Sequence, residues 1–206
     1  MTTRIQKTSE DWWATSIIDM KPGSIRFRGY AIEDLIGRIG FAEMVWLLTR
    51  GELPHPAAAK LLEAALVSAV DHGPQAPSIA AARMAITCGV GINNAMANAA
   101  NMLGDVHGGA GEQCVSLFNA IAARMGEKSS GMAEAVTLEM NALAQQGVTH
   151  VPGFGHRFHP LDPRAPRLLE LVDEAAKTGA VSGRFAAIGR TVEAELEKRK
   201  KRRIPM

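Results

Sequence analysis

The chain has 206 residues, 47% of them apolar and 5% aromatic, and a formal net charge of +2. This length is sufficient to bury a hydrophobic core, and the charge is too small to indicate a nucleic-acid or membrane partner. The first residues lack a signal-peptide pattern, and no apolar run approaches the roughly 20 residues that cross a bilayer, so we expect a cytoplasmic protein.

The composition favours helices over strands. Aromatic side chains, which favour strands, are scarce, whereas the helix-favouring residues alanine, leucine, methionine and glutamate are frequent. The two cysteines, Cys88 and Cys114, stand in apolar surroundings without the spacing of a metal site or a redox motif. We therefore predict a mainly α fold with reduced thiols and no bound metal.

The first elements expected along the chain are short. A Lys-Pro-Gly turn divides residues 16–30 into two stretches of alternating apolar residues, which predicts a small hairpin or an extended entry segment. Apolar residues then recur at helical spacing over residues 32–48. Gly40 interrupts this pattern and Gly51 ends it, which predicts two short helices.

The middle of the chain is rich in small residues. A helix is expected to begin at Pro56 and to end near Asp71. Residues 78–103 are crowded with alanine, glycine and asparagine, which allow another helix to approach closely. This segment is predicted to be deeply buried or to form a dimer interface, with a bend at Gly89 and Gly91.

Four helices are predicted in the second half of the chain, over residues 114–125, 131–146, 165–177 and 182–202. Two glycine-rich turns interrupt this pattern, DVHGGAG before the first of these helices and VPGFGHRFHPLDPR before the third. The last helix is expected to bury one apolar stripe. The stripe consists of Phe185, Ile188, Val192 and Leu196.

Three of the six histidines stand where helices are expected to stop. His72, His107 and His156 each lie in a turn with glycine or proline, a place from which a scaffold can present side chains into a cleft. His107 also comes just before a predicted helix start. For each of them the spacing alone leaves open both a catalytic role and a surface or capping role.

Five segments of the chain have characteristic sequences that follow one another in a characteristic order. They read FRGYAIEDLIG (27–37), FAEMVWLLTRGELP (41–54), DHGPQAPS (71–78), DVHGGAG (105–111) and VPGFGHRFHPLDPRA (151–165). Together they resemble the citrate synthase superfamily, which includes citrate synthases, citryl-CoA lyases and the citryl-CoA-cleaving module of ATP-citrate lyase. The resemblance implies a mainly α, citrate synthase-like helical fold.

This resemblance implies roles for four side chains. His107 would hydrogen-bond the thioester carbonyl as the acetyl group enolises, and His156 would polarise the ketone of oxaloacetate. His72 and Arg164 would hold the oxaloacetate carboxylates. Such roles are physically sound because a donor aimed at the developing enolate stabilises its charge, and because a planar guanidinium suits a carboxylate. The alternative for Arg164 is a surface arginine at a helix start.

The resemblance also implies how a CoA thioester would bind. CoA would enter as part of the substrate, and no tightly bound cofactor is expected. Arg157 is the candidate for its phosphates, and the backbone of one turn would lie beside the adenine. That turn consists of Val151, Pro152, Gly153, Phe154 and Gly155.

The implied domain organisation is incomplete. Residues 1–108 would form a large-domain half and residues 109–206 a small-domain half, with family members pairing as homodimers. The resemblance further implies an aspartate general base in a segment that should begin where the sequence reaches Met206. Losing such a base costs about 100-fold to 10,000-fold in rate. We therefore expect a truncated product of a longer gene or a natural variant that binds ligand without full turnover.

Three functional hypotheses follow. The first is a citrate synthase-like acyltransferase of the tricarboxylic acid cycle, which condenses acetyl-CoA with oxaloacetate or a related 2-oxo acid. Its alternative is a citryl-CoA lyase, which catalyses the reverse carbon–carbon bond step. His107 favours the synthase, whereas the short chain favours the lyase. The second is a catalytically impaired relative that binds CoA or a dicarboxylate. The third is a nucleic-acid or anionic-surface contact through the basic run 198–203, for which a solvated helix face is the simpler explanation.

Overall fold

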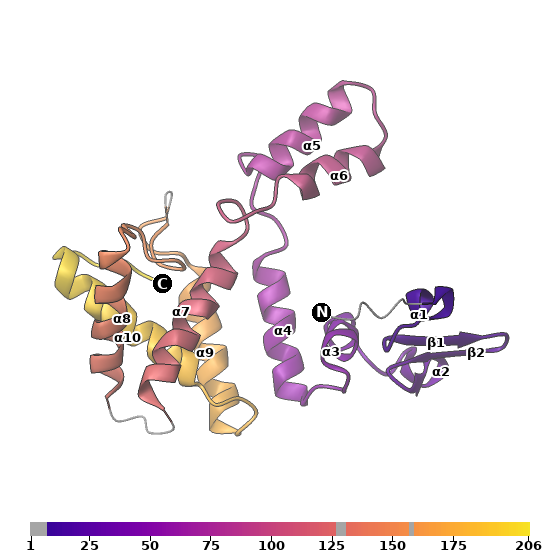
Figure 1. Ribbon diagram of the computed structural model, residues 1–206, viewed down its shortest axis with the longest axis horizontal. Helices are drawn as coiled ribbons and strands as arrows, with labels where there is room; N and C mark the ends of the chain where they lie inside the picture. The colour runs from indigo at the N-terminus through magenta and orange to yellow at the C-terminus, as the bar shows by residue number, and fades with distance from the viewer. Residues whose placement is uncertain (1–7, 127–130, 157–158) are drawn as a thin grey trace, which may run out of the picture. The chain divides into compact units, whose positions relative to one another are not determined.

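The computed structural model describes residues 8–126, 131–156 and 159–206, and this part of the chain contains ten α-helices and three short strands (Figure 1). The predicted mainly α class is therefore confirmed. The chain divides into two compact units, Met1–Leu66 and Val67–Met206. The boundary expected at residue 108 concerns the large and small halves of the family fold, and it stays a prediction.

The N-terminal unit contains a small antiparallel sheet. Strands β1 (Ile18–Lys21), β2 (Ser24–Phe27) and β3 (Tyr30–Ala31) pair in this order, with Ile18 opposite Phe27 in the first pair. The predicted hairpin is thus confirmed. The two-residue strand β3 is too short to show an alternating pattern, and the sequence did not indicate it.

Helices precede and follow this sheet along the chain. Helix α1 (Ser9–Trp13) precedes it, helices α2 (Ile32–Leu35) and α3 (Phe41–Arg50) follow it, and α4 (Pro56–Ser68) leads into the second unit. Gly51 ends α3 with a left-handed φ of 88°, which glycine adopts without steric cost. The predicted pair of short helices and the helix that begins at proline are confirmed, whereas α1 was not predicted.

Residues 78–103 form a helical hairpin. Helix α5 (Pro77–Thr87) and helix α6 (Ile92–Asn101) lie against each other (Figure 1), and Gly89 turns the chain between them with a φ of 78°. Every residue of α5 is exposed or half-buried, and in α6 the side chain of Ala95 alone is buried. The expectation of deep burial within this chain is therefore wrong. The alternative of a dimer interface stays a prediction.

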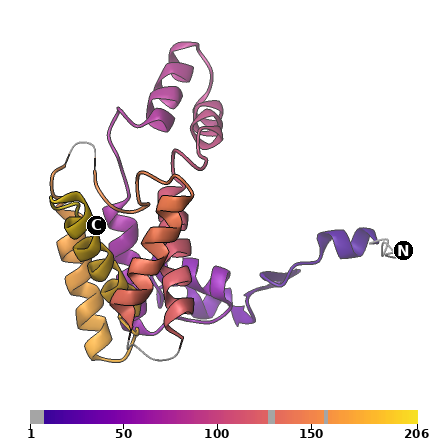
Figure 2. The same cartoon turned by 60° about the vertical axis from the view of Figure 1, so that its left-hand side comes forward.

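Four helices form a bundle at the C-terminal end of the second unit. Helices α7 (Ala110–Met125), α8 (Met132–Gln145), α9 (Arg164–Lys177) and α10 (Arg184–Lys200) match the four predicted ones, and both views show them side by side (Figures 1 and 2). Apolar side chains of α7, α8 and α10, together with Phe154 from the loop before α9, form the core of the unit. Its buried members are Leu117, Phe118, Ile121, Met125, Ala135, Val136, Met140, Phe154, Ile188, Val192 and Leu196.

The predicted stripe on α10 is correct except at its first position. Ile188, Val192 and Leu196 are at most 3% exposed, and burying such a side chain stabilises a fold by about 1.5–3 kcal/mol. Phe185 is 40% exposed, so its predicted burial is wrong. It lies in the first turn of α10, where its ring contacts Phe118 at a centroid distance of 6.0 Å from the edge of the core.

Candidate active site

The loop that carries His107 is held by its own backbone. The N–H of Gly104 donates to the carbonyl oxygen of His107 at 2.9 Å, and the N–H of Gly109 donates to that of Gly104 at 3.0 Å. Gly108 has a φ of 110°, and a Cβ on Gly109 would lie 2.7 Å from the carbonyl oxygen of Asp105. Both positions require glycine, and the loop delivers His107 just before α7 begins.

The ring of His107 is half-buried and contacts the start of α5. Its Nε2 accepts the backbone N–H of Ser78 at 3.2 Å. N–H groups in the first turn of a helix have no partner within the helix, so the ring satisfies one of them. Because Nε2 accepts, the neutral ring carries its proton on Nδ1. His107 can therefore offer one N–H donor without being charged.

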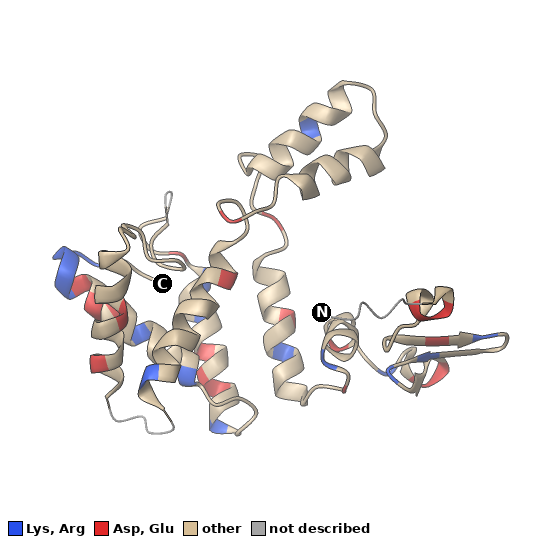
Figure 3. Ribbon diagram, viewed as in Figure 1, with Lys and Arg blue, Asp and Glu red and all other residues tan. Residues whose placement is uncertain are grey.

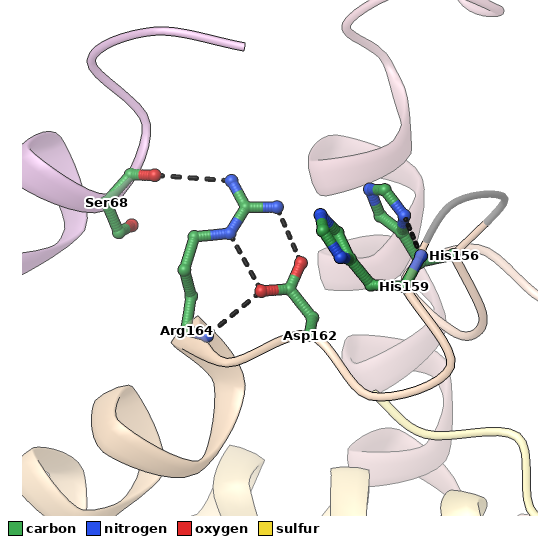
Figure 4. A network of polar contacts seen from close by, with 5 residues as sticks. All are labelled: Ser68, His156, His159, Asp162 and Arg164. Atoms are coloured by element: carbon green, nitrogen blue, oxygen red, sulfur yellow. Dashed lines mark hydrogen bonds and ion pairs between the residues drawn. The ribbon is translucent and has the colours of Figure 1, made fainter. Parts of the chain in front are cut away.

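Arg164 and Asp162 form a two-point ion pair at the start of α9 (Figure 4). Arg164 Nε donates to Asp162 Oδ1 at 2.9 Å and Nη2 donates to Oδ2 at 2.6 Å, while the Arg164 backbone N–H also donates to Oδ1 at 2.9 Å. Hydrogen bonds from Arg164 hold the pKa of Asp162 well below its ordinary value, and the charge of His156 lowers it further. The same bonds raise the pKa of Arg164.

Arg164 also reaches the end of α4. Its Nη1 donates to the carbonyl oxygen of Ser68 at 3.2 Å, which is one of the terminal helix carbonyls that lack a partner within the helix. A guanidinium has five N–H donors, and the bonds to Asp162 and Ser68 use three of them. These three bonds leave one N–H of Nη1 and one N–H of Nη2 unused. A second carboxylate can therefore meet Arg164 end-on while Asp162 stays bound.

His156 and His159 are neighbours in the loop before α9. The backbone N–H of His159 donates to Nδ1 of His156 at 3.1 Å, and the ring centroids lie 4.8 Å apart (Figure 4). Both side chains are exposed. His72 is likewise exposed, in the turn between α4 and α5, where Asp71 accepts the N–H of Gly73 at 2.9 Å.

The turn from Val151 to Gly155 is packed into the second unit. Phe154 is 8% exposed and meets Phe118 edge-on at 6.3 Å, and the N–H of Gly155 donates to the carbonyl oxygen of Pro205 at 2.7 Å. Val151 and Pro152 are half-buried, whereas Gly153 and Gly155 are exposed. This turn is thus anchored at Phe154 and Gly155, and its glycines lie at the surface. Arg157, the candidate for CoA phosphates, lies outside the described residues.

The two thiols differ in burial. Cys88 is exposed and Cys114 half-buried, and both are free. Burial raises the pKa of the Cys114 thiol, so it stays protonated and packs as a small apolar group. In the described part of the chain, no three histidine, cysteine or acidic side chains are placed to hold a metal ion.

Figure 3 shows basic and acidic residues close to one another near the end of α10. Arg199 Nε lies 2.8 Å from a carboxylate oxygen of Glu195, and Arg203 Nε lies 2.9 Å from one of Glu193. Such pairs are typical of a solvated helix face. No described helix is both long and apolar enough to cross a membrane.

The described hydrogen bonds join the predicted side chains to different partners, and a charge interaction also links His156 to Asp162. His107 is joined to Ser78, Arg164 to Asp162 and Ser68, and His156 to His159. Sequence reasoning missed these supporting residues. The Asp-Pro-Arg spacing could have indicated Asp162, because a carboxylate two residues before an arginine can fold back on it. No sequence signal joins Ser78 to His107, which are 29 residues apart.

Comparisons with known proteins agree with the fold. The family model described as citrate synthase, C-terminal domain, matches residues 5–59 and 54–205. The structure of citryl-CoA lyase from Hydrogenobacter thermophilus is similar, with a TM-score of 0.78 and 28% identity over 94% of this chain and 71% of the lyase. A search of curated proteins found no match.

Two further solved structures share the fold. ATP citrate lyase from Methanosaeta concilii, solved with (3S)-citryl-CoA, has a TM-score of 0.77 and 21% identity over 98% of this chain and 31% of its own length. Citrate synthase from Pyrobaculum aerophilum has a TM-score of 0.57 and 24% identity over 77% of this chain and 37% of its own. The family match spans nearly all of the sequence, and the chain belongs to the citrate synthase family.

Proposed function

We propose that this chain acts on citryl-CoA, cleaving it into acetyl-CoA and oxaloacetate. The observation that carries the proposal is the similarity to citryl-CoA lyase, which extends over 94% of the chain at 28% identity. The similarity to citrate synthase covers 77% at 24% identity, with a lower TM-score. The comparison therefore favours the lyase, which was the alternative from the sequence, over the synthase, which was the first hypothesis.

The proposed reaction breaks one carbon–carbon bond. The tertiary hydroxyl of citryl-CoA gives up its proton to solvent, and the oxygen electron pair forms the ketone of oxaloacetate. The pair of the broken carbon–carbon bond moves onto the thioester as an enolate, whose carbon then takes up a proton to give acetyl-CoA. Negative charge thus passes from the hydroxyl oxygen to the thioester oxygen. A catalyst must stabilise charge at both places.

His107 is the proposed donor for the thioester oxygen. Its Nε2 accepts from Ser78, so Nδ1 of the neutral ring bears the proton that an enolate oxygen would accept. Donors fixed in advance at the position of developing charge need no rearrangement during the reaction. The glycine loop that holds the His107 backbone supplies this fixed position.

Arg164, His72 and His156 are the proposed contacts of the oxaloacetate part. Arg164 has one N–H left on each terminal nitrogen by its described bonds, which suits a carboxylate end-on. His156 would donate to the ketone or alkoxide oxygen, and His72 to the second carboxylate. The turn from Val151 to Gly155 would lie beside the adenine of CoA.

The experiment that tests this proposal supplies citryl-CoA and measures oxaloacetate with malate dehydrogenase and NADH. We expect oxaloacetate to form, and to stop forming when His107 is replaced by alanine. Absence of oxaloacetate would reject the lyase proposal. The second candidate, condensation of acetyl-CoA with oxaloacetate, is favoured by the family match and is tested in parallel by release of free CoA.

We further propose that the chain forms a homodimer through α5 and α6. Met84, Ile92 and Met96 are 70%, 74% and 66% exposed on this hairpin. Large apolar side chains gathered on an exposed surface are typical of protein interfaces. The small side chains of the hairpin would also let the helices of a second copy approach closely.

A further inference from the structure

The pair formed by His156 and His159 has a defined geometry (Figure 4). The N–H of His159 lies 3.1 Å from Nδ1 of His156, and the ring planes are inclined by 35° at a centroid distance of 4.8 Å. Both side chains are exposed, so burial in the core does not hold either ring. The hydrogen bond and the ring contact described for His156 both come from His159 in the same loop.

The hydrogen bond determines which nitrogen of His156 carries a proton. A backbone N–H only donates, so Nδ1 has to present its lone pair. A neutral imidazole carries one proton, which then resides on Nε2. In this tautomer Nε2 is a donor, which suits a ketone or alkoxide oxygen.

The ring contact restricts rotation of His156. The last side-chain torsion of histidine is broad and does not define one orientation by itself. A second ring at 4.8 Å lies within the range of stacked aromatic contacts and limits this torsion. Orientation matters because a misplacement of about 1 Å in a reacting assembly can lower the rate about 100-fold.

Arg164, which follows the same loop, is also held by a nearby residue. Asp162 binds the guanidinium of Arg164 through two parallel hydrogen bonds. The loop thus carries two candidate substrate contacts, His156 and Arg164. Each is held by a partner two or three residues away.

We propose that His159 is a positioning residue for His156, with its backbone N–H setting the tautomer and its ring setting the orientation of the Nε2 donor. This inference rests on the proposed function, in which Nε2 donates to the oxygen of the oxaloacetate part. In this assignment His159 touches no reacting atom. Its ring can therefore be replaced by another aromatic ring without loss of the reaction.

The test uses two variants and one control in the full chain. His159→Phe keeps the backbone N–H and a stacking ring, whereas His159→Ala keeps only the N–H. His150→Ala removes an exposed histidine whose described partner is Thr149. For citryl-CoA cleavage we expect kcat to fall about tenfold or more in His159→Ala with little change in KM, and to return to within about twofold in His159→Phe.

The kinetic outcomes separate positioning from direct contact. Unchanged kcat in His159→Ala would overturn the positioning role of the ring. Equal impairment of His159→Phe and His159→Ala would also overturn it, because the imidazole nitrogens and not the ring plane would then be required. A matching loss in His150→Ala would mean that the assay reports general damage.

Nuclear magnetic resonance tests the same proposal without turnover. At about pH 8.5, where an ordinary imidazole is neutral, we expect Nδ1 of His156 to show a pyridine-like nitrogen shift and Nε2 a pyrrole-like one. A protonated Nδ1 would overturn the tautomer assignment. We expect the His156 ring signals to change in His159→Ala and to stay in His150→Ala. These spectra decide the proposal even where citryl-CoA is not cleaved, so its failure is distinguishable from failure of the proposed function.

Discussion

Gly153 lies so close to Cys114 that a single added methyl group would collide with it. A Cβ built on Gly153 would stand 2.5 Å from Cys114 Sγ and 3.0 Å from its Cβ. Gly153 also has a φ of 84°, in the left-handed region that favours glycine. The turn proposed to lie beside the CoA adenine therefore depends on glycine for two independent reasons.

Replacing Gly153 by alanine should destabilise the second unit by about 2–4 kcal/mol. The left-handed backbone accounts for about 1–2 kcal/mol and the collision with Cys114 for the remainder. Gly147→Ala is the matched control, because Gly147 has a φ of 79° and open space where its Cβ would lie. Urea unfolding followed by circular dichroism measures both. Equal losses in the two variants would contradict the described contact with Cys114.

The Asp162–Arg164 pair predicts a dependence of stability on acid. The folded-state pKa of Asp162 is lowered, so its contribution is fully present above the ordinary carboxyl pKa of 3.8 and is lost as the pH falls below it. We expect Asp162→Asn to be less stable than the wild type at pH 7, with the difference shrinking below about pH 4. Unfolding midpoints in urea over this pH range give the comparison.

The same variant should weaken oxaloacetate binding about tenfold, because Arg164 loses the partner that orients it. Asp173→Asn provides the control, since Asp173 forms a similar two-point pair with Arg190 on exposed surface. Isothermal titration calorimetry measures the affinity. An oxaloacetate affinity in Asp162→Asn equal to that of Asp173→Asn would show that Arg164 needs no such support.

Replacement of His107 by alanine should lower kcat for citryl-CoA cleavage about 100-fold to 1,000-fold, the usual effect of removing one donor to developing charge. The fold should persist, because the ring makes one described hydrogen bond to the backbone of Ser78 at the start of α5. Far-ultraviolet circular dichroism checks the fold. A kcat in His107→Ala close to that of His150→Ala would exclude the proposed donor role.

The proposed dimer predicts a concentration-dependent mass. Wild-type protein should elute as a dimer in size-exclusion chromatography with light scattering, and Met96→Glu should shift it toward monomer, because a charge in an apolar interface is costly to bury. Leu138→Glu, on α8 and 49% exposed, should leave the mass unchanged. A monomeric wild type would reject the interface.

The sequence predicted helix positions well because local signals determine them. Pro56 begins α4, Gly51 ends α3, and helical spacing of apolar residues located all four bundle helices. Burial was predicted less well. The small residues of α5 and α6 indicate that another helix approaches closely, but they do not show whether that helix belongs to the same chain. Both helices are exposed in the single chain, so no further helix among its described residues covers them.

The candidate site was predictable in its residues but not in its contacts. The motifs around His107, His156 and Arg164 are short continuous sequences, so they could be recognised. The bonds that hold these side chains cross 29 residues in one case and 96 in another, to Ser78 and Ser68, and no local pattern encodes such pairings. Asp162 and His159 lie inside the recognised segment 151–165, yet their roles depend on the geometry of the loop.

The central claim, that this chain cleaves citryl-CoA with the help of His107 and His156, is tested most directly by one coupled assay. Wild type, His107→Ala, His156→Ala and His150→Ala are each given citryl-CoA, and oxaloacetate is followed through NADH oxidation by malate dehydrogenase. We predict oxaloacetate formation by the wild type and His150→Ala, and a loss of about 100-fold or more in the other two variants. Formation at the background rate by the wild type, or at equal rates by all four proteins, would contradict the account.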